Sequence, residues 1–163
     1  RDAASVVGAG ADNGGGIAVN GVTNAHKVTL IDMSISGSRA TLGGALTAEA
    51  QSTVELRDVT ISGNSATVDG GAMNNSGTTT FLNSTITGNQ ANSDGDFIGA
   101  AGGVFADGGT LTLKNTILAG NTDAGQGSKE PECDGNAVTS QGHNLVGILD
   151  GSPTPPARPT RSG

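Results

Sequence analysis

The sequence predicts an all-β protein: a right-handed, single-stranded parallel β-helix of about four to five coils, followed by an extended proline-rich C-terminal tail. Three observations lead to this prediction. One phrase of strand-forming residues recurs four times, each copy carries a glycine turn, and the composition is rich in small residues but has only three Phe and no Trp or Tyr. So few aromatic side chains would make a weak globular core, whereas small residues suit stacked short strands.

The four copies of the repeated phrase align on one glycine. They occupy residues 28–40, 54–66, 78–91 and 111–123, with the glycine at Gly37, Gly63, Gly88 and Gly120. A second phrase that contains Gly-Gly precedes each copy, at 14–19, 43–48, 70–75 and 102–107. The period is 26 residues from Val28 to Val54 but 32 from Thr79 to Leu111, so the third unit carries an insertion of about seven residues.

Each unit is expected to contain two or three short strands separated by Gly, Asn and Asp turns. Apolar and polar residues alternate along the first strand of each copy, and stacking the coils places the apolar positions in inward rows. The predicted rows are Val28, Val54, Thr79 and Leu111; Leu30, Leu56, Phe81 and Leu113; and Ile35, Ile61, Ile86 and Leu118. A fourth row consists of Met33, Val59, Ser84 and Thr116. It becomes more polar along the chain, so the pattern leaves its burial open.

Two rows of turn residues are predicted to stack from coil to coil. Asn64, Asn89 and Asn121 each follow the aligned glycine, and their side-chain amides are expected to hydrogen-bond along the stack as a ladder. The second row, five residues before the glycine, holds Asp32, Asp58, Asn83 and Asn115. Because stacked carboxylates repel each other, Asp32 and Asp58 are expected to face water.

Charge and composition argue against several classes of partner. The net charge is −7, and phosphate binding needs clustered Lys and Arg, so no nucleic-acid partner is expected. No apolar run reaches the length of a membrane span. The single cysteine, Cys133, cannot form a disulfide within the chain. It is expected to be buried as a small apolar residue, with an interchain bond as the alternative.

Domain organisation follows from where the repeats end. Residues 1–147 are predicted to form one β-helix domain. Residues 148–163 contain four of the five prolines and no apolar periodicity, so an extended tail or linker is expected. The chain begins at Arg1, within the repeat pattern and without Met or a signal peptide. We therefore expect it to be a piece of a longer precursor.

Three features of the sequence resemble those of a known group of proteins. They are the Gly-Gly phrases, the strand pair TLTLKNTILAGN (110–121), and the closing segments PECDG (131–135) and TSQGHNLVG (139–147). They resemble bacterial secreted β-helix proteins, including those with polymorphic outer-membrane-protein-like repeats and those that end in a choice-of-anchor Q region. The matching positions of the final coil are Leu118, Gly120, Asn121, Pro131, Cys133, Ser140, Gly142, Asn144, Leu145, Val146 and Gly147.

The resemblance covers about residues 12–147. It implies a right-handed parallel β-helix and a secreted or cell-surface location, and it carries over no catalytic residue. The Asp-Asn-Gly-Gly-Pro stretch that usually follows in that group does not follow Gly147 here. We therefore expect this chain to lack the cell-anchoring end of that group.

The insertion in the third unit, NSDGDFIGA (92–100), is the best local candidate for a binding site. Asp94 and Asp96 flank a glycine and are candidate calcium ligands, with a plain solvated turn as the alternative. Phe97 and Ile98 form an apolar pair, which either covers the core or contacts a partner. No other cofactor is expected.

The repeated outward positions do not favour catalysis. A polysaccharide lyase or hydrolase needs acids, or an acid and a base, at matching positions of adjacent coils. The outward row Thr29, Glu55, Thr80 and Thr112 contains one acid. Glu55 and Arg57 also interrupt the threonine rows that an ice-binding face would need. Enzymatic and ice-binding functions are therefore minority alternatives.

The predicted function is that of a secreted or cell-surface structural protein of bacterial type, whose β-helix rod associates end to end into a homopolymeric filament or surface layer. No segment has the pattern of a capping helix. An uncapped solenoid exposes unpaired N–H and C=O groups that template further strand pairing. The alternative is an adhesin-like module that binds a polysaccharide or a protein partner through the 92–101 loop and the outward Thr and Asn face.

Overall fold

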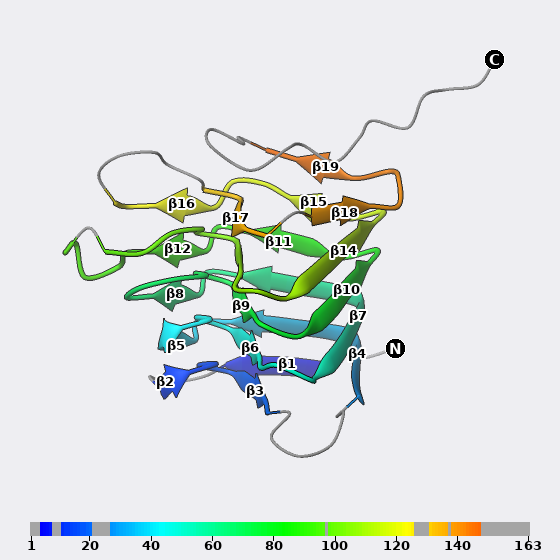
Figure 1. The fold of residues 1–163 in the computed structure, drawn as a ribbon, viewed down its shortest axis with the longest axis horizontal. Helices are drawn as coiled ribbons and strands as arrows, with labels where there is room; N and C mark the ends of the chain where they lie inside the picture. Colours follow the sequence, from blue (N-terminus) through cyan, green and yellow to red (C-terminus); the bar gives the residue numbers. More distant parts are fainter. Residues whose placement is uncertain are drawn as a thin grey trace.

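The computed structural model describes residues 4–7, 11–20, 27–96, 98–125, 131–136 and 138–147, and of residues 4–7 and 11 only the backbone. Phe97 and the predicted tail, 148–163, lie outside the described residues. Within the described part every regular element is a strand, and Figure 1 shows these strands stacked as successive turns of a solenoid. The strands of this part pair in parallel, for example β4 (Lys27–Ser36) with β7 (Thr53–Ser62), which confirms the predicted parallel β-helix.

Three parallel sheets run along the solenoid, and each coil visits them in the order A, B, C. Sheet A contains β1 (Ala4–Val7), β4, β7, β10 (Thr78–Leu82), β11 (Thr85–Thr87), β14 (Thr110–Lys114), β15 (Ile117–Leu118), β18 (Val138–Ser140) and β19 (Leu145–Val146). Sheet B contains β2 (Ala11–Asn13), β5 (Arg39–Leu42), β8 (Ser65–Ala66), β12 (Gln90–Ala91) and β16 (Thr122–Asp123). Sheet C contains β3 (Ile17–Val19), β6 (Leu46–Ala48), β9 (Met73–Asn75), β13 (Val104–Ala106) and β17 (Cys133–Gly135).

The predicted inward rows of sheet A are confirmed by its register. Val28 pairs with Val54, Leu30 with Leu56 and Ile35 with Ile61, and the rows continue through the later coils to Val138 and Val146. The fourth row also points inward, because Val59, Ser84 and Thr116 are buried. Its polar members are accommodated by hydrogen bonds to the backbone, which the alternation of residues could not reveal.

Small residues line the interior of sheet B, whereas larger ones fill sheet C. Ala40, Ala66 and Ala91 are buried on sheet B. The corresponding row of sheet C consists of Ile17, Leu46, Met73, Val104 and Cys133. Cys133 is 2% exposed, which confirms its predicted burial in the core.

The Gly-Gly phrases form the tight turns that lead from sheet B to sheet C. The first glycine is left-handed, as at Gly70 with φ of 64°. The second approaches the next coil so closely that a Cβ on Gly44 would lie 2.1 Å from the carbonyl oxygen of Gly71. The fourth phrase is shifted by one residue, because Val104 pairs with Met73. The left-handed position is therefore taken by Ala101, with φ of 58°.

Candidate functional site

The predicted asparagine ladder is present and buried. The side-chain amide of Asn64 donates to Asn89 Oδ1 at 2.9 Å, and that of Asn89 donates to Asn121 Oδ1, also at 2.9 Å. Each acceptor oxygen also receives the backbone N–H of the preceding asparagine at 3.1 Å. The ladder thus joins the turns between sheets A and B of three successive coils.

Different residues stand at the two ends of this ladder. At the N-terminal end the backbone N–H of Ser38 donates to Asn64 Oδ1 at 3.0 Å. At the other end Glu132, 2% exposed, receives the Asn121 side-chain amide at 2.7 Å and the Gly120 N–H at 2.8 Å. Glu132 therefore supplies the acceptors that the next coil would otherwise provide, a role that the sequence pattern did not predict.

The second row of turn residues occupies the corner within sheet A. Its members are left-handed, with φ between 50° and 57°: Asp32, Asp58, Asn83, Asn115 and His143. Asp and Asn tolerate this conformation better than other non-glycine residues. Asp58 is exposed as predicted, and Asn115 donates its side-chain amide to Asn83 Oδ1 at 2.8 Å. The structure adds His143 to this row, which the repeated phrase did not include.

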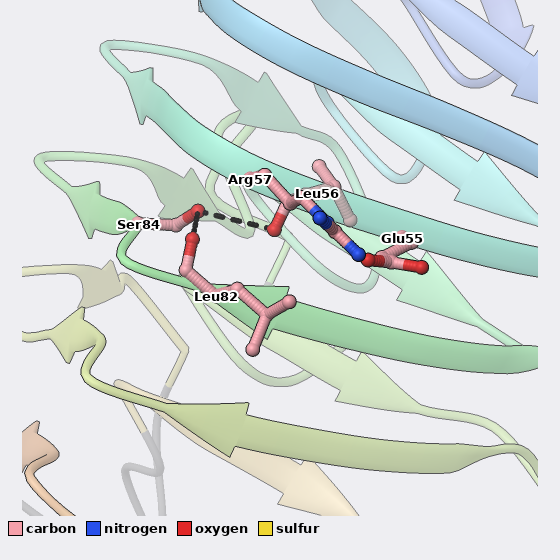
Figure 2. Close-up of polar contacts among 5 residues, drawn as sticks. All are labelled: Glu55, Leu56, Arg57, Leu82 and Ser84. Atoms are coloured by element: carbon pink, nitrogen blue, oxygen red, sulfur yellow. Dashed lines mark hydrogen bonds and ion pairs between the residues drawn. The ribbon is translucent and has the colours of Figure 1, made fainter.

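Ser84 shows how the interior of this corner accepts a polar side chain. Its hydroxyl contacts the carbonyl oxygens of Leu82 and Leu56 at 2.9 and 3.4 Å (Figure 2). The hydroxyl oxygen also accepts the N–H of Val59 at 3.3 Å. On sheet A, Arg57 forms an ion pair with Glu55. The Arg57 side chain is 52% exposed, so this ion pair contributes little to stability.

The insertion between β12 and β13 projects into solvent. Asp94 and Asp96 are exposed, and each accepts a backbone N–H two residues ahead, from Asp96 at 3.4 Å and from Ile98 at 2.9 Å. Ile98 is 63% exposed, so it does not cover the core. Within the described residues no three His, Cys, Asp or Glu side chains gather as a metal-binding group.

A polar cluster lies at the base of this insertion. The side-chain amide of Asn92 donates to Asp123 Oδ1 and, at 3.2 Å, to the carbonyl oxygen of Gly99. Asp69 Oδ1 receives the N–H of Ala100 at 2.7 Å. Burial raises the pKa of Asp69, nearby carboxylates raise it further, and the Ala100 N–H opposes them.

Surface grooves among the described residues lie over sheet B and at the corner of sheet A. The groove over sheet B has a volume of about 310 Å³ and is lined by Arg39, Ala40, Ser65, Thr67, Gln90, Ser93 and Asp94. The groove at the corner of sheet A has a volume of about 460 Å³ and is lined by Asn83, Ser84, Thr85, Asn115, Ile117, His143, Asn144 and Leu145. Both present mainly amides and hydroxyls, which can hydrogen-bond to a polar ligand.

The C-terminal end of the described solenoid consists of strand edges. β16 is the last strand of sheet B, β17 of sheet C, and β18 and β19 of sheet A. Val138 and Val146 pack on the core but remain partly exposed, and Leu145 beside them is 59% exposed. In the part of the chain that the structure describes, no helix is long and apolar enough to cross a membrane.

Comparison with known proteins adds no family or relative. No protein-family model matches the chain, and neither a curated protein nor a solved structure does so.

Proposed function

We propose that the protein is a secreted or cell-surface structural solenoid of bacterial type that associates end to end, through its strand edges, into a filament or layer. The observation that carries the proposal is the continuation of the inward apolar rows into the last described coil. There Val138 and Val146 pack against the core from one side and remain partly exposed. The proposed extracellular location rests on the resemblance of the repeats to bacterial secreted β-helix proteins.

The backbone of β19 supports the proposal. Leu145 and Gly147 donate their N–H groups to Thr116 and Leu118 of the preceding coil, both at 3.0 Å. Because alternate residues of a parallel strand bond to opposite neighbours, the N–H and C=O of Val146 point toward the edge that no described strand covers. A parallel strand of a second copy could pair there, and a head-to-tail contact of this kind propagates without closing.

The Asn ladder would not take part in this contact. Glu132 already occupies the acceptor positions beyond Asn121. The proposed association therefore joins strand edges of the sheets and leaves this corner closed within each copy.

Light scattering and negative-stain electron microscopy at rising protein concentration test the proposal. We expect filaments or large species from the full chain. Val146→Pro removes an N–H that faces the open edge, where proline is tolerated, and is expected to give monomers. Leu145→Lys changes the neighbouring exposed side chain but leaves the edge intact, so it should still associate. A full chain that stays monomeric, or association lost in Leu145→Lys but kept in Val146→Pro, would contradict end-to-end assembly.

A second candidate function is the binding of a polysaccharide in the groove over sheet B. Arg39, Ser65 and Gln90 are paired neighbours on three successive coils, and Asp94 lies at the same groove. This row offers charged and neutral donors and acceptors along the solenoid axis, which suits a chain of sugar hydroxyls.

A glycan array followed by calorimetry tests this second function. Arg39→Ala and Gln90→Ala should each weaken binding of any retained glycan by about tenfold, or ~1.4 kcal/mol. Arg57→Ala removes an exposed arginine from sheet A and is the matched control. No retained glycan, or an equal loss in Arg57→Ala, would exclude binding in this groove.

A further inference from the structure

Inward apolar side chains remain partly exposed at both ends of the described solenoid. In the middle coils Val54 and Leu56 are at most 1% exposed. Val28 and Leu30 occupy the same rows one coil earlier, yet they are only half-buried. The partly buried apolar residues that pack against the core, among those described, lie at one end or the other: Ile17, Val28, Leu30, Met33, Val138 and Val146. Each end of the described solenoid therefore lacks a neighbouring coil.

Strand β1 covers one part of the N-terminal edge. Its backbone pairs with Met33–Ser36, the part of β4 that follows the corner of sheet A, and Ile35 in this part is fully buried. The first part of β4, residues 27–31, pairs only with β7 among the described strands. This uncovered part of the edge contains the half-buried Val28 and Leu30.

The two ends of the solenoid belong to the same rows. Following the strand pairs from coil to coil connects Val138 with Val28, Val146 with Ile35, and Cys133 with Ile17. The C-terminal end of one copy therefore presents strands in the register that would continue the sheets at the N-terminal end of a second copy.

The number of strands along each face decides how a second copy can dock. Sheets B and C each contain five described strands, and so does sheet A before its corner: β4, β7, β10, β14 and β18. After the corner sheet A contains six: β1, β4, β7, β11, β15 and β19. If a second copy continues sheets B, C and the first part of sheet A, its β1 must occupy the place that β19 of the first copy already fills. Figure 1 shows β1 and β19 at opposite ends of the solenoid, so this conflict arises only between copies.

We propose that β1 is an exchangeable strand, which covers the edge of β4 in the free protein and gives way to β19 of a second copy during end-to-end association. The inference rests on the function proposed above and names the surface that receives the partner. In the assembly, Leu145 and Val146 of one copy pair with Ser34 and Ile35 of the next. β18 then pairs with the uncovered part of β4, and sheets B and C continue from β16 and β17.

The exchange replaces one strand contact by a larger set of contacts. β1 pairs with β4 over four residues. β19 offers two residues at the same place, but the same docking adds three residues from β18, two from β16 and three from β17. Docking also covers Val28 and Leu30. A strand at the end of a solenoid opens more readily than one in the middle coils, so β1 can be displaced.

Disulfide cross-linking between copies tests the register. Leu145→Cys is mixed with either Ser34→Cys or Ser5→Cys and oxidised, and Leu145→Cys alone is the control for the buried Cys133. Neighbouring strands place paired residues about 4.8 Å apart, within the ~4.4–6.8 Å between Cα atoms that a disulfide spans. Exchange predicts a cross-linked dimer with Ser34→Cys and none with Ser5→Cys. The reverse result would mean that β19 stacks on an intact β1, which overturns the inference.

A disulfide within one copy tests whether β1 has to leave. Ser5 pairs with Ser34, so oxidised Ser5→Cys/Ser34→Cys ties β1 to β4. Light scattering should show loss of association after oxidation and its return in DTT, and circular dichroism shows whether both forms are folded. Oxidised Thr60→Cys/Thr85→Cys carries the same bond between paired residues of the middle coils and should associate like the wild type.

Strand exchange and end-to-end association can fail separately. If oxidised Ser5→Cys/Ser34→Cys associates as well as its reduced form, β1 does not have to leave. The inference is then overturned, while end-to-end association stands. A variant without residues 1–7 should associate at a lower concentration than the wild type, because the edge of β4 is already open. If this variant and the wild type both stay monomeric, end-to-end association itself fails, and the exchange with it.

Discussion

The buried carboxylate of Glu132 accepts a hydrogen bond of 2.7 Å from the side-chain amide of Asn121 and so ends the asparagine ladder. Within the ladder every amide donates to the next coil and accepts from the previous one. A carboxylate can only accept, so it satisfies the last asparagine and passes no donor onward. Glu132 also accepts the N–H of Gly120. In the preceding coil the equivalent N–H, that of Gly88, donates to the backbone carbonyl of Gly120 instead.

Replacing Glu132 is expected to loosen the last coil. Glu132→Gln places an amide donor against N–H groups of Gly120 or Asn121 and should cost about 1–2 kcal/mol in the free energy of unfolding. Glu132→Ala leaves buried donors unsatisfied and should cost about 2–4 kcal/mol. Urea denaturation measures the loss, and hydrogen exchange at the Gly120 and Asn121 amides locates it.

Glu55→Gln is the matched control, because Glu55 is half-buried on sheet A and pairs with Arg57, which is exposed to solvent. It should change the free energy of unfolding by less than about 1 kcal/mol. Equal effects of Glu132→Gln and Glu55→Gln would show that Glu132 does not end the ladder.

Substitutions within the buried asparagine ladder should lower the free energy of unfolding more than substitutions in the exposed row of turn residues at the corner of sheet A. Asn89 donates to Asn121 and to the carbonyl of Ile61, and it accepts from Asn64. Asn89→Ala should therefore destabilise by about 2–4 kcal/mol, because several buried groups lose their partners. Asn115→Gly removes an exposed amide but keeps the left-handed conformation, so it should cost less than about 1 kcal/mol. Thermal and urea unfolding measure the stability of both variants. Similar losses of stability in Asn89→Ala and Asn115→Gly would contradict the prediction that burial makes the ladder residues more important.

Residues that repeat were predictable, because repetition reveals their place in the stack. Leu30, Leu56 and Asn89 recur at one period, and alternation along a strand assigns them to the interior or to a turn. The fold, the three apolar rows and the ladder followed from this pattern. The polar members of the fourth row did not, because their burial depends on backbone carbonyls that only the folded coil brings within reach.

The roles of residues that break a row could not be predicted from the sequence. Asp123 follows Ala40, Ala66 and Ala91 in one row of sheet B, and Glu132 takes the position held by Gly103 in the coil before it. An acid in a row of small residues is a visible signal. Its partners come from other coils, however, so alignment of the phrases could not identify them. The same holds for Ala101, since the shift of the Gly-Gly phrase appears only in the strand register.

Ala101→Gly is expected to stabilise the protein. Ala101 holds the left-handed position that Gly14, Gly43 and Gly70 occupy in the other coils. This conformation costs an alanine about 1–2 kcal/mol, and the extra freedom of glycine in the unfolded chain offsets about 0.4–1 kcal/mol of the gain. A net increase of about 0.5–1 kcal/mol should appear in urea denaturation.

Replacing glycine by alanine at this position in another coil should lower the stability of the protein. A Cβ on Gly70 would lie 2.2 Å from the carbonyl oxygen of Met73, so Gly70→Ala should destabilise by more than about 1 kcal/mol. Destabilisation by Ala101→Gly would mean that burial of the Ala101 methyl group outweighs the relief of strain.

Asp69→Asn should increase the stability of the protein at neutral pH. Burial and nearby carboxylates raise the pKa of Asp69 in the folded state, so the folded protein holds this proton more tightly than the unfolded chain. Stability therefore falls as the pH rises through the raised pKa, and the full cost of the ionised carboxylate is present at neutral pH. The asparagine oxygen can still accept the Ala100 N–H. At pH 7 the gain should be at most about 1 kcal/mol, because partial exposure of Asp69 screens its charge.

The gain from Asp69→Asn should shrink as the pH falls through the raised pKa of Asp69 and vanish below the ordinary pKa of an aspartate, because wild-type Asp69 is then neutral as well. Thermal unfolding at several pH values measures this dependence, with Asp94→Asn at an exposed position as a control whose stability should change little. If Asp69→Asn is the less stable protein at neutral pH, the hydrogen bond to Ala100 outweighs the cost of the buried charge, and the carboxylate stabilises the turn.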